Sequence, residues 1–391
     1  MIRQLILMVI LIWAVLFTAT AQRCGAVYTS ELVPEPTEVV WPFRGIIQIP
    51  VVVHVVYKSA AENISNAQIE SQLAVLNADY RRLADTGFIP AEFRNRIADM
   101  QLEFCLAKRD PKGLATSGVT RKMTNLESIG LSTAVYYDDQ GGTDAWNPDQ
   151  YLNIWIANMG ANQTGRSSFP GQGIQAEDGV VIDPRYFGTI GLAADEAPYH
   201  LGRTATHEIG HYFNLLHPWG PDPISCNQDD GVTDTPESGQ TFLMTCPTDE
   251  QESCSSSDMY TNFMYYTDDA CMGQFTPGQR DRVWATLFGV RAGLLESLAC
   301  YSPETAPDPN ALSFQIVPNP NDGYFEIHLD GFPATTIQLA LYSMDGRLVW
   351  QDTSSYSNPI GIGLPVQLAS GVYILRITAN GQRANRKFLK L

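Results

Sequence analysis

The chain of 391 residues has six histidines, and three of them lie within eleven positions, from His207 to His217. An α-helix advances by about 100° per residue, so His207 and His211 stand one turn apart on one face and can reach a single metal ion. Glu208 points alongside such a metal, where its carboxylate can take a proton from metal-bound water. Zinc hydrolases keep three protein ligands and leave the fourth position to water. The segment therefore predicts a zinc site that carries its own catalytic base.

The third histidine requires a turn in the chain. In a continuous helix, His217 would lie roughly 240° round from His211 and would face away from the metal. A residue in the left-handed conformation ends a helix most readily, and asparagine tolerates this conformation best after glycine. We therefore expect the helix to end at Asn214. The alternative is an ordinary amphipathic helix with two histidines and a glutamate, which a third histidine at this distance disfavours.

The histidine pattern resembles that of the metzincin metallopeptidases, and residues 207–220 are similar to the cytophagalysin branch of the pappalysin family. Metzincins also place a methionine beneath the metal, in a tight turn downstream. Residues 261–266, Thr-Asn-Phe-Met-Tyr-Tyr, match this turn. The resemblance implies that Met264 is the floor of the zinc site and that Tyr266 is a flexible ligand or a donor to the oxyanion. Taken alone, a methionine among aromatic residues more often fills a core.

The function that the resemblance implies is that of a secreted zinc metalloendopeptidase. Such an enzyme hydrolyses peptide bonds by attack of a zinc-bound water that Glu208 activates, after which Glu208 protonates the leaving amine. A catalytically silent extracellular binding protein on the same scaffold is the alternative. It would have lost Glu208 or a ligand, and none is lost. A zinc enzyme acting on a non-peptide bond is disfavoured by the match to the methionine-containing turn and by the substrate-binding edge strand that the resemblance implies at residues 179–183.

The natural substrate and the cleavage specificity are not determined by the chain. Some relatives favour Arg or Lys after the scissile bond and use an acidic residue near the methionine-containing turn. Just before Cys271 this sequence has Ala270, with Asp268 and Asp269 close by. The sequence departs from the pattern here, so the resemblance does not carry that specificity over.

The elements that must position the site indicate an α+β fold. We expect strands at 47–56, 101–107, 151–157 and 179–183, a helix from Ser65 to Arg82, and a last helix after Pro277 that includes Val290 and Leu294. The resemblance implies a metzincin-like domain with a twisted, mostly parallel sheet, a zinc helix, a methionine-containing turn and a C-terminal helix. It also makes residues 179–183 the edge strand that pairs with extended substrate, with plain core as the alternative.

Composition limits the class of protein. A hydrophobic content of 44% excludes a disordered chain, and a net charge of −17 argues against binding to nucleic acid, whose phosphates need a basic surface. The charge is uneven, because residues 312–391 sum to +1 and the preceding residues to −18. We therefore expect a catalytic domain at 46–300, a Pro-rich linker at 301–311 and a second domain at 312–391.

Short alternating segments in the second domain predict a small antiparallel β-sandwich. Residues 318–323 and 369–373, together with the basic tail, resemble the C-terminal sorting domain of type IX secretion. The resemblance implies a secretion machinery as partner and a secreted or cell-surface location. A carbohydrate-binding sandwich is the alternative and would need an exposed aromatic row. The candidates for that row are Tyr324, Tyr342 and Trp350.

The N-terminus predicts a secretory signal peptide at 1–21. Thirteen apolar residues, Leu5 to Phe17, precede an Ala-Thr-Ala cleavage pattern. A membrane anchor is the alternative, but a span needs about 20 apolar residues. We expect residues 22–45 to form a pro-segment and the mature protein to be soluble, with no stable membrane span.

Export makes the seven cysteines informative, because thiols pair outside the cytosol. Family resemblance suggests the pairs Cys226–Cys254 and Cys246–Cys271, and Cys105 and Cys300 could form a third, although sequence alone leaves the connectivity open. Cys24 is then left over, close after the expected cleavage site. In several metzincins a pro-segment cysteine occupies the position of the water on zinc and keeps the enzyme latent, and we expect this role for Cys24. A lipoprotein cysteine or an incidental thiol is the alternative.

Residues 229–235 contain clustered carboxylates, which calcium accepts as ligands. Relatives that carry calcium nearby make Asp230 and Asp234 the candidate ligands. An Asx-rich turn is the alternative. The histidines His54 and His200 are expected to have structural roles.

Overall fold

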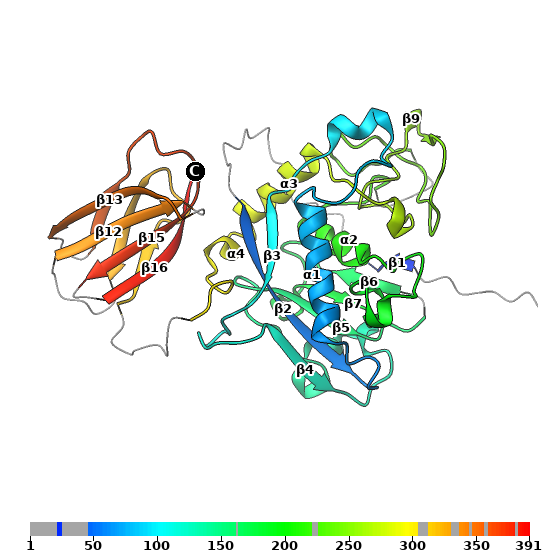
Figure 1. The fold of residues 1–391 in the computed structure, drawn as a ribbon, viewed down its shortest axis with the longest axis horizontal. Coiled ribbons are helices and arrows are strands. Elements are labelled where there is room, and N and C mark those ends of the chain that lie inside the picture. Colours follow the sequence, from blue (N-terminus) through cyan, green and yellow to red (C-terminus); the bar gives the residue numbers. More distant parts are fainter. Residues whose placement is uncertain are drawn as a thin grey trace, which may run out of the picture.

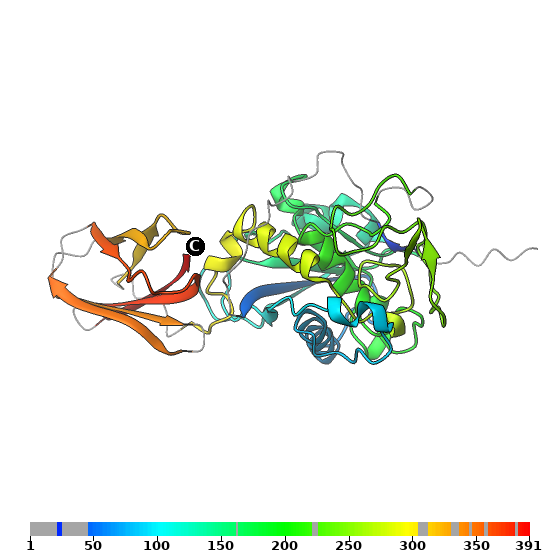
Figure 2. The ribbon, with the colours of Figure 1, turned by 90° about the horizontal axis from the view of Figure 1, so that it is seen from above.

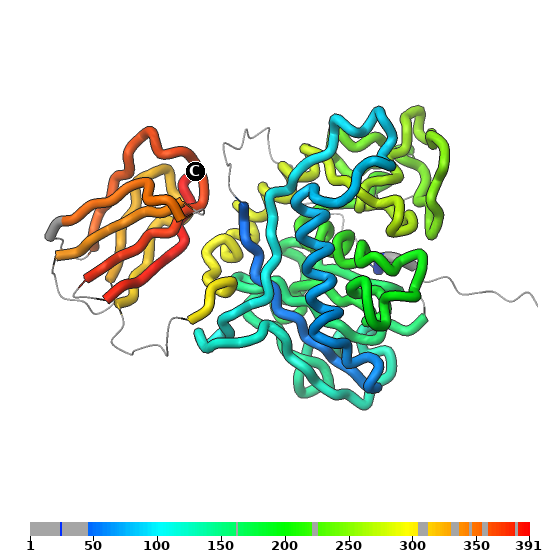
Figure 3. Tube along the Cα trace, viewed as in Figure 1, coloured from blue at the N-terminus to red at the C-terminus, as the bar shows by residue number. Residues whose placement is uncertain are grey.

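The computed structural model describes residues 22–25, 46–161, 163–220, 226–303, 312–329, 336–343, 346–355, 359–379 and 382–391, and Figure 3 traces them. The expected signal peptide, most of the expected pro-segment and most of the expected linker lie outside these residues. The domain boundaries derived from the sequence therefore stay predictions. Among the described residues, no helix combines the length and the apolar character needed to cross a bilayer.

A seven-stranded sheet forms the centre of the larger body (Figure 1). Its strands are β1 (Gln22–Cys24), β2 (Ile47–Tyr57), β3 (Leu102–Leu106), β4 (Val119–Met123), β5 (Leu152–Ala157), β6 (Gln163–Ser167) and β7 (Val180–Ile182). The order is β1-β6-β7-β5-β2-β3, with β4 also paired to β2, and every pair except β6–β7 is parallel. β2 is buried along nearly its whole length, as its run of β-branched residues predicts.

The expected rim strand is wrong in its position. β7 lies inside the sheet between β6 and β5, and each of its residues is at most 1% exposed. The strand at that end of the sheet is β1, which pairs in parallel with β6. Three apolar residues in a row suit a strand buried on both faces. Continuous hydrophobicity at 179–183 therefore indicated an interior strand.

The described residues form four α-helices beside the sheet: α1 (Asn66–Tyr80), α2 (Arg203–Tyr212), α3 (Pro277–Phe288) and α4 (Gly293–Glu296). Ser65 caps α1 as expected, by accepting from the backbone N–H of Gln68. α1 packs against α2, where the Tyr80 hydroxyl donates to the Thr206 carbonyl over 3.1 Å. Short 3₁₀-helices connect the elements at Ala91–Arg96, Ile129–Leu131, Thr133–Tyr136, Asp138–Gln140, Gln175–Glu177, Pro184–Tyr186, Gly191–Ala193 and Asp269–Cys271.

The expected last helix is divided in two. α3 ends at Phe288 because Gly289 adopts φ −107° and ψ −110°, a conformation that glycine permits. Val290, which was expected to lie on the buried side, is 56% exposed, whereas Leu294 is buried in α4. The apolar spacing had suggested one continuous helix across this break.

The smaller body is an antiparallel β domain, seen beside α4 in Figures 1 and 2. Its strands are β10 (Phe314–Val317), β11 (Tyr324–Leu329), β12 (Thr336–Ser343), β13 (Leu348–Ser355), β14 (Ile360–Gly363), β15 (Gly371–Ala379) and β16 (Gln382–Lys390). They form two sheets, β10-β11-β14 and β13-β12-β15-β16, around their own apolar core. Tyr324 lies in the first sheet, and Tyr342 and Trp350 lie in the second, so these three residues form no single aromatic row. Together the two bodies confirm the expected fold class.

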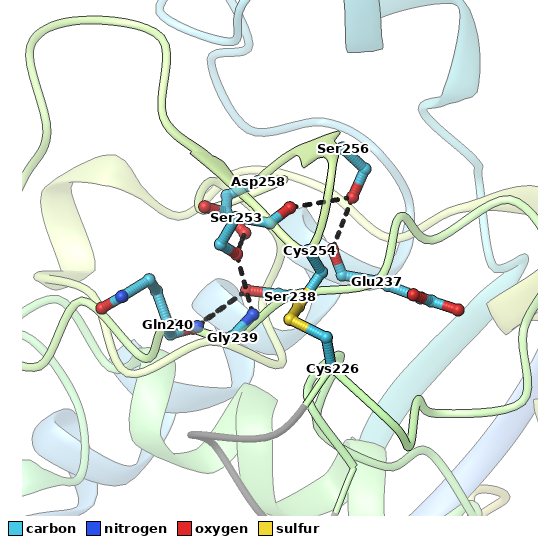
Figure 4. The surroundings of a disulfide bond; sticks show 9 residues. All are labelled: Cys226, Glu237, Ser238, Gly239, Gln240, Ser253, Cys254, Ser256 and Asp258. Atoms are coloured by element: carbon cyan, nitrogen blue, oxygen red, sulfur yellow. Dashed lines mark hydrogen bonds between the residues drawn. A yellow bond between two sulfur atoms is a disulfide. The ribbon is translucent and has the colours of Figure 1, made fainter.

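Three disulfides are present: Cys105–Cys300, Cys226–Cys254 and Cys246–Cys271. These are the pairs suggested above, and Cys24 takes part in none of them. The Cys226–Cys254 disulfide cross-links the loops between α2 and α3, which carry the short strands β8 (Glu252–Ser253) and β9 (Ser256–Ser257). Beside it, Gly239 N–H donates to Ser253 Oγ over 2.8 Å and Ser256 Oγ donates to the Glu237 carbonyl over 2.6 Å (Figure 4). This irregular segment is therefore held by cross-links and local hydrogen bonds.

Candidate active site

The helix that carries two of the three clustered histidines is anchored at its start by a distant aspartate. α2 begins after Gly202, whose φ is 79°, and no side chain of its own caps it. Asp269 supplies the cap: its Oδ2 accepts from the backbone N–H groups of Leu201 (2.9 Å) and Arg203 (3.2 Å). A carboxylate is favourable there because the first N–H groups of a helix lack partners within the helix.

A second buried carboxylate fixes the first turn of α2. Asp79, from the end of α1, accepts from Thr206 Oγ1 over 2.7 Å and from the Arg203 guanidinium over 3.2 Å. Burial raises the pKa of Asp79 to about 6, and Arg203 and Thr206 act against this rise. Neither Asp79 nor Asp269 was identified as a positioning residue from the sequence, since each lies more than fifty residues from α2 along the chain.

The three histidines meet at one point. The Nε2 atoms of His207, His211 and His217 lie 3.1 Å from one another in all three pairs. That spacing is close to the roughly 3.3 Å edge of a tetrahedron with metal–nitrogen bonds of about 2.0–2.1 Å. The Nδ1 atoms of His207 and His211 face the carbonyls of Phe263 (2.8 Å) and Leu215 (2.7 Å), to which they can only donate. This leaves Nε2 unprotonated and directed at the common point, so the residues fit a metal.

Burial keeps the rings of His211 and His217 neutral. It lowers the pKa of His211 to about 4, and burial together with the other two histidines lowers the pKa of His217 well below its usual value. Neutral imidazole is the form that binds a metal. The cluster therefore offers three nitrogen lone pairs in a buried pocket.

The turn that returns His217 to the cluster forms where the sequence predicted it. α2 ends at Tyr212, and Asn214 adopts a φ of 74°. The N–H of Leu215 then donates to the Gly210 carbonyl over 2.9 Å. A left-handed residue with such a bond closes the helix and reverses the chain.

Glu208 and Cys24 complete the cluster. Both are buried, and Cys24 Sγ lies 3.6 Å from Glu208 Oε2. Cys24 Sγ and the three histidine ligand atoms all lie within 4.8 Å of one another. β1 brings Cys24 there by pairing it with Gly165 of β6. A Cβ at Gly165 would stand 2.9 Å from Glu208 Cγ, so only glycine leaves the carboxylate its place.

Met264 lies against α2, and Tyr266 lies against His217. A Cβ at Gly210 would stand 2.5 Å from Met264 Sδ, so the methionine packs directly beneath α2. Its backbone N–H donates to Asn262 Oδ1 over 2.9 Å, and Asn262 is bonded in turn to Gln279 in the first turn of α3. The Tyr266 ring centroid lies 4.8 Å from that of His217.

Trp219 stacks on His217 with 4.7 Å between ring centroids and planes 16° apart, a contact that the sequence did not predict.

His54 has the structural role expected of it. Its ring is hydrogen-bonded to Thr120 Oγ1 and Asn153 Oδ1, and burial lowers its pKa to about 4.

The candidate calcium ligands lie apart from the histidine cluster. Asp230 Oδ1 accepts from Val232 N–H and Thr235 Oγ1, and burial raises the pKa of Asp230 to about 7. Asp234 accepts from groups at the start of α3. Within the part of the chain that the structure describes, the only grouping of three or more metal-ligating side chains is that of Cys24 with the three histidines.

Comparison with known proteins gives two family matches. Residues 135–288 match the peptidase family described as "Pregnancy-associated plasma protein-A", and residues 315–390 match the family described as "Secretion system C-terminal sorting domain". The two matches fall in the larger and the smaller body.

Individual relatives agree with these matches. The chain is 29% identical over 294 residues to an extracellular metalloprotease of Arthroderma benhamiae, an alignment that covers 70% of this chain and 94% of the relative. It is 30% identical over 256 residues to an extracellular metalloprotease of Verticillium alfalfae, covering 62% of this chain and 78% of the relative. Among solved structures, mature mirolysin of Tannerella forsythia in complex with a cleaved peptide is similar, with 43% identity and a TM-score of 0.61. This match covers 64% of this chain and 96% of that one.

Proposed function

The chain belongs to the pappalysin (M43) family of metallopeptidases, and on that premise we propose that it is a zinc endopeptidase whose metal is held by His207, His211 and His217. It is an extracellular metalloprotease with a C-terminal secretion sorting domain. The observation that carries the zinc proposal is the triangle of Nε2 atoms 3.1 Å apart. Three neutral imidazole nitrogens with one position left over are the donor set of a catalytic zinc site.

Glu208 is the proton carrier in this proposal. Zinc in the site would supply a Lewis acid that polarises the scissile carbonyl and favours deprotonation of a water. Glu208 takes the proton of the attacking water and passes it to the leaving amine. Tyr266 donates to the developing oxyanion, and Met264 supports the histidines from below. A silent binding protein on this scaffold would lack Glu208 or a histidine, and this chain retains all four.

Extended peptide is the proposed substrate form. β6 is paired with β1 in this structure and becomes the edge strand when β1 leaves, so a peptide can then add to it by backbone hydrogen bonds. A preference for basic residues is not part of the proposal. Ala270 carries no charge, Asp268 Oδ1 accepts from the Ala270 N–H, and the Asp269 carboxylate accepts hydrogen bonds at the start of α2. A calcium ion at Asp230 and Asp234 stays a prediction.

Latency is part of the proposal. Cys24 would ligate the zinc in the precursor and occupy the place that the attacking water needs. The support is the approach of its sulfur to the three histidine nitrogens and to Glu208.

Replacing His217 with alanine should abolish zinc retention as well as activity. We expect zinc affinity to fall by more than about 100-fold, since loss of even an outer hydrogen-bond partner costs about 10- to 100-fold. Zinc content after dialysis and the circular dichroism spectrum should be measured together. His328→Ala, in β11 of the smaller body, is the matched control and should keep its zinc. A folded His217→Ala protein with wild-type zinc content would show that the third ligand is misassigned.

The secretion machinery is the proposed partner of residues 312–391. A chain without them should accumulate inside the cell, and a reporter carrying the signal peptide and residues 302–391 should be exported. The fusion is informative because this domain has its own apolar core, whereas truncation also uncovers contacts of Val372 and Leu389 with the larger body. A reporter with the signal peptide alone is the control. Normal export of the truncated chain would contradict the proposal.

A further inference from the structure

Arg291, between α3 and α4, donates three hydrogen bonds, one to the end of α2 and two to Asp178. Its Nε donates to the carbonyl of Tyr212, the last residue of α2, over 2.8 Å. Its Nη1 and Nη2 donate to the two oxygens of Asp178 over 2.7 and 2.9 Å. The guanidinium also lies over the Tyr212 ring, with Cζ 3.4 Å from the centroid. Arg291 is only 7% exposed, so these contacts are largely shielded from solvent.

The hydrogen bond from Arg291 to the Tyr212 carbonyl holds the start of the turn that places His217. The last carbonyls of a helix have no partner within the helix, and a cation is favourable at that end. Arg291 supplies both the donor and the charge at Tyr212, two residues before the left-handed Asn214. A displacement of Tyr212 would be passed through this turn to His217.

The second contact acts on the segment between β6 and β7. Asp178 also accepts from Ser168 Oγ over 2.6 Å, which closes the base of this segment. Phe169, which follows Ser168, packs with its ring centroid 5.2 Å from that of His211. Asp178 therefore links Arg291 to a side chain that limits where His211 can move, and the same segment continues from β6, the strand that pairs with β1.

We propose that Arg291 is a positioning residue of the protease, which holds the end of α2 and the β6–β7 segment in the arrangement that the metal-binding histidines require. The proposal rests on the proposed function in that it takes His211 and His217 as metal ligands. Lysine cannot replace Arg291, because one ammonium cannot donate to Tyr212 and bind both oxygens of Asp178 in a planar fork. An ordinary structural ion pair would add stability without affecting the chemistry or the metal.

The test compares Arg291→Lys and Asp178→Asn with wild type in the active secreted enzyme. We expect kcat to fall by about tenfold or more well below the unfolding temperature, because small displacements in a catalytic site are costly. Zinc should also pass to a chelator faster. The control is Arg280→Lys, since Arg280 pairs only locally with Asp281 on α3, and it should match wild type in both measurements. In Arg291→Ala, added guanidinium at low millimolar concentration should restore part of kcat.

Unchanged kcat and zinc release with a lower unfolding temperature would overturn the proposal and leave Arg291 a structural residue. Asp178→Asn keeps the side-chain shape, so its kcat and zinc release test the positioning role of Arg291 even if the arginine variants do not fold. Failure of the proposed function is distinguishable: a wrong zinc assignment would appear as a wild-type protein without zinc, and a wrong base assignment as an active Glu208→Ala variant. Neither of those results depends on Arg291.

Discussion

Proteolysis should fall by at least about 100-fold when Glu208 is replaced with alanine, because the variant loses its general base. Zinc content should stay at the wild-type level. The three histidine nitrogens form their triangle without any contribution from Glu208, so the carboxylate is needed to move protons and not to hold the metal. Casein cleavage and zinc content should be measured on the same preparation.

Two further variants make this result specific. Glu208→Gln keeps the shape that fits against Gly165 and should be as inactive as the alanine variant, since an amide cannot accept the proton. Glu237→Ala removes an exposed glutamate and should behave as wild type. If Glu208→Ala kept more than about a tenth of the wild-type rate, another group would have to serve as the base, because loss of a general base costs about 10²-fold or more.

The precursor with Cys24→Ala should cleave substrate without prior processing, whereas the wild-type precursor should be nearly silent. The thiol lies among the three histidine nitrogens and 3.6 Å from Glu208 Oε2, where it would exclude the water that Glu208 must activate. Thiolate is a strong zinc ligand and alanine offers none. Initial rates of both purified precursors should be measured before and after limited proteolysis.

The structure also suggests a second way in which the pro-segment could inhibit the precursor. β1 pairs with β6, so the pro-segment could inhibit by filling the substrate edge even without a thiol. If the alanine precursor is as silent as wild type, and both gain activity on limited proteolysis, thiol blockade is wrong and strand pairing is the inhibitory device. Cys24→Ser serves as a control for shape, since its hydroxyl is a poorer zinc ligand and should release most of the activity.

Features that depend on spacing within a few turns of chain could be predicted from the sequence. His207 and His211 had to share a helix face, and the left-handed turn at Asn214 followed from where His217 must return. The buried strand β2 and the cap at Ser65 were likewise local patterns. Met264 and Tyr266 were different, since only resemblance to a family separated them from ordinary core residues.

Tertiary structure alone decided which distant residues meet. Cys24 reaches Glu208, 184 positions away, through the pairing of β1 with β6, and no local pattern encodes that register. The same holds for the anchoring of α2 by Asp79 and Asp269 and for the contacts of Arg291. The dependence on strand order also explains why residues 179–183 were wrongly predicted to form an edge strand. The hydrophobicity of a strand indicates how deeply it is buried but not which strands lie beside it. A side chain's neighbours across the sheet depend on strand order and register, which are set by the packing of the whole domain.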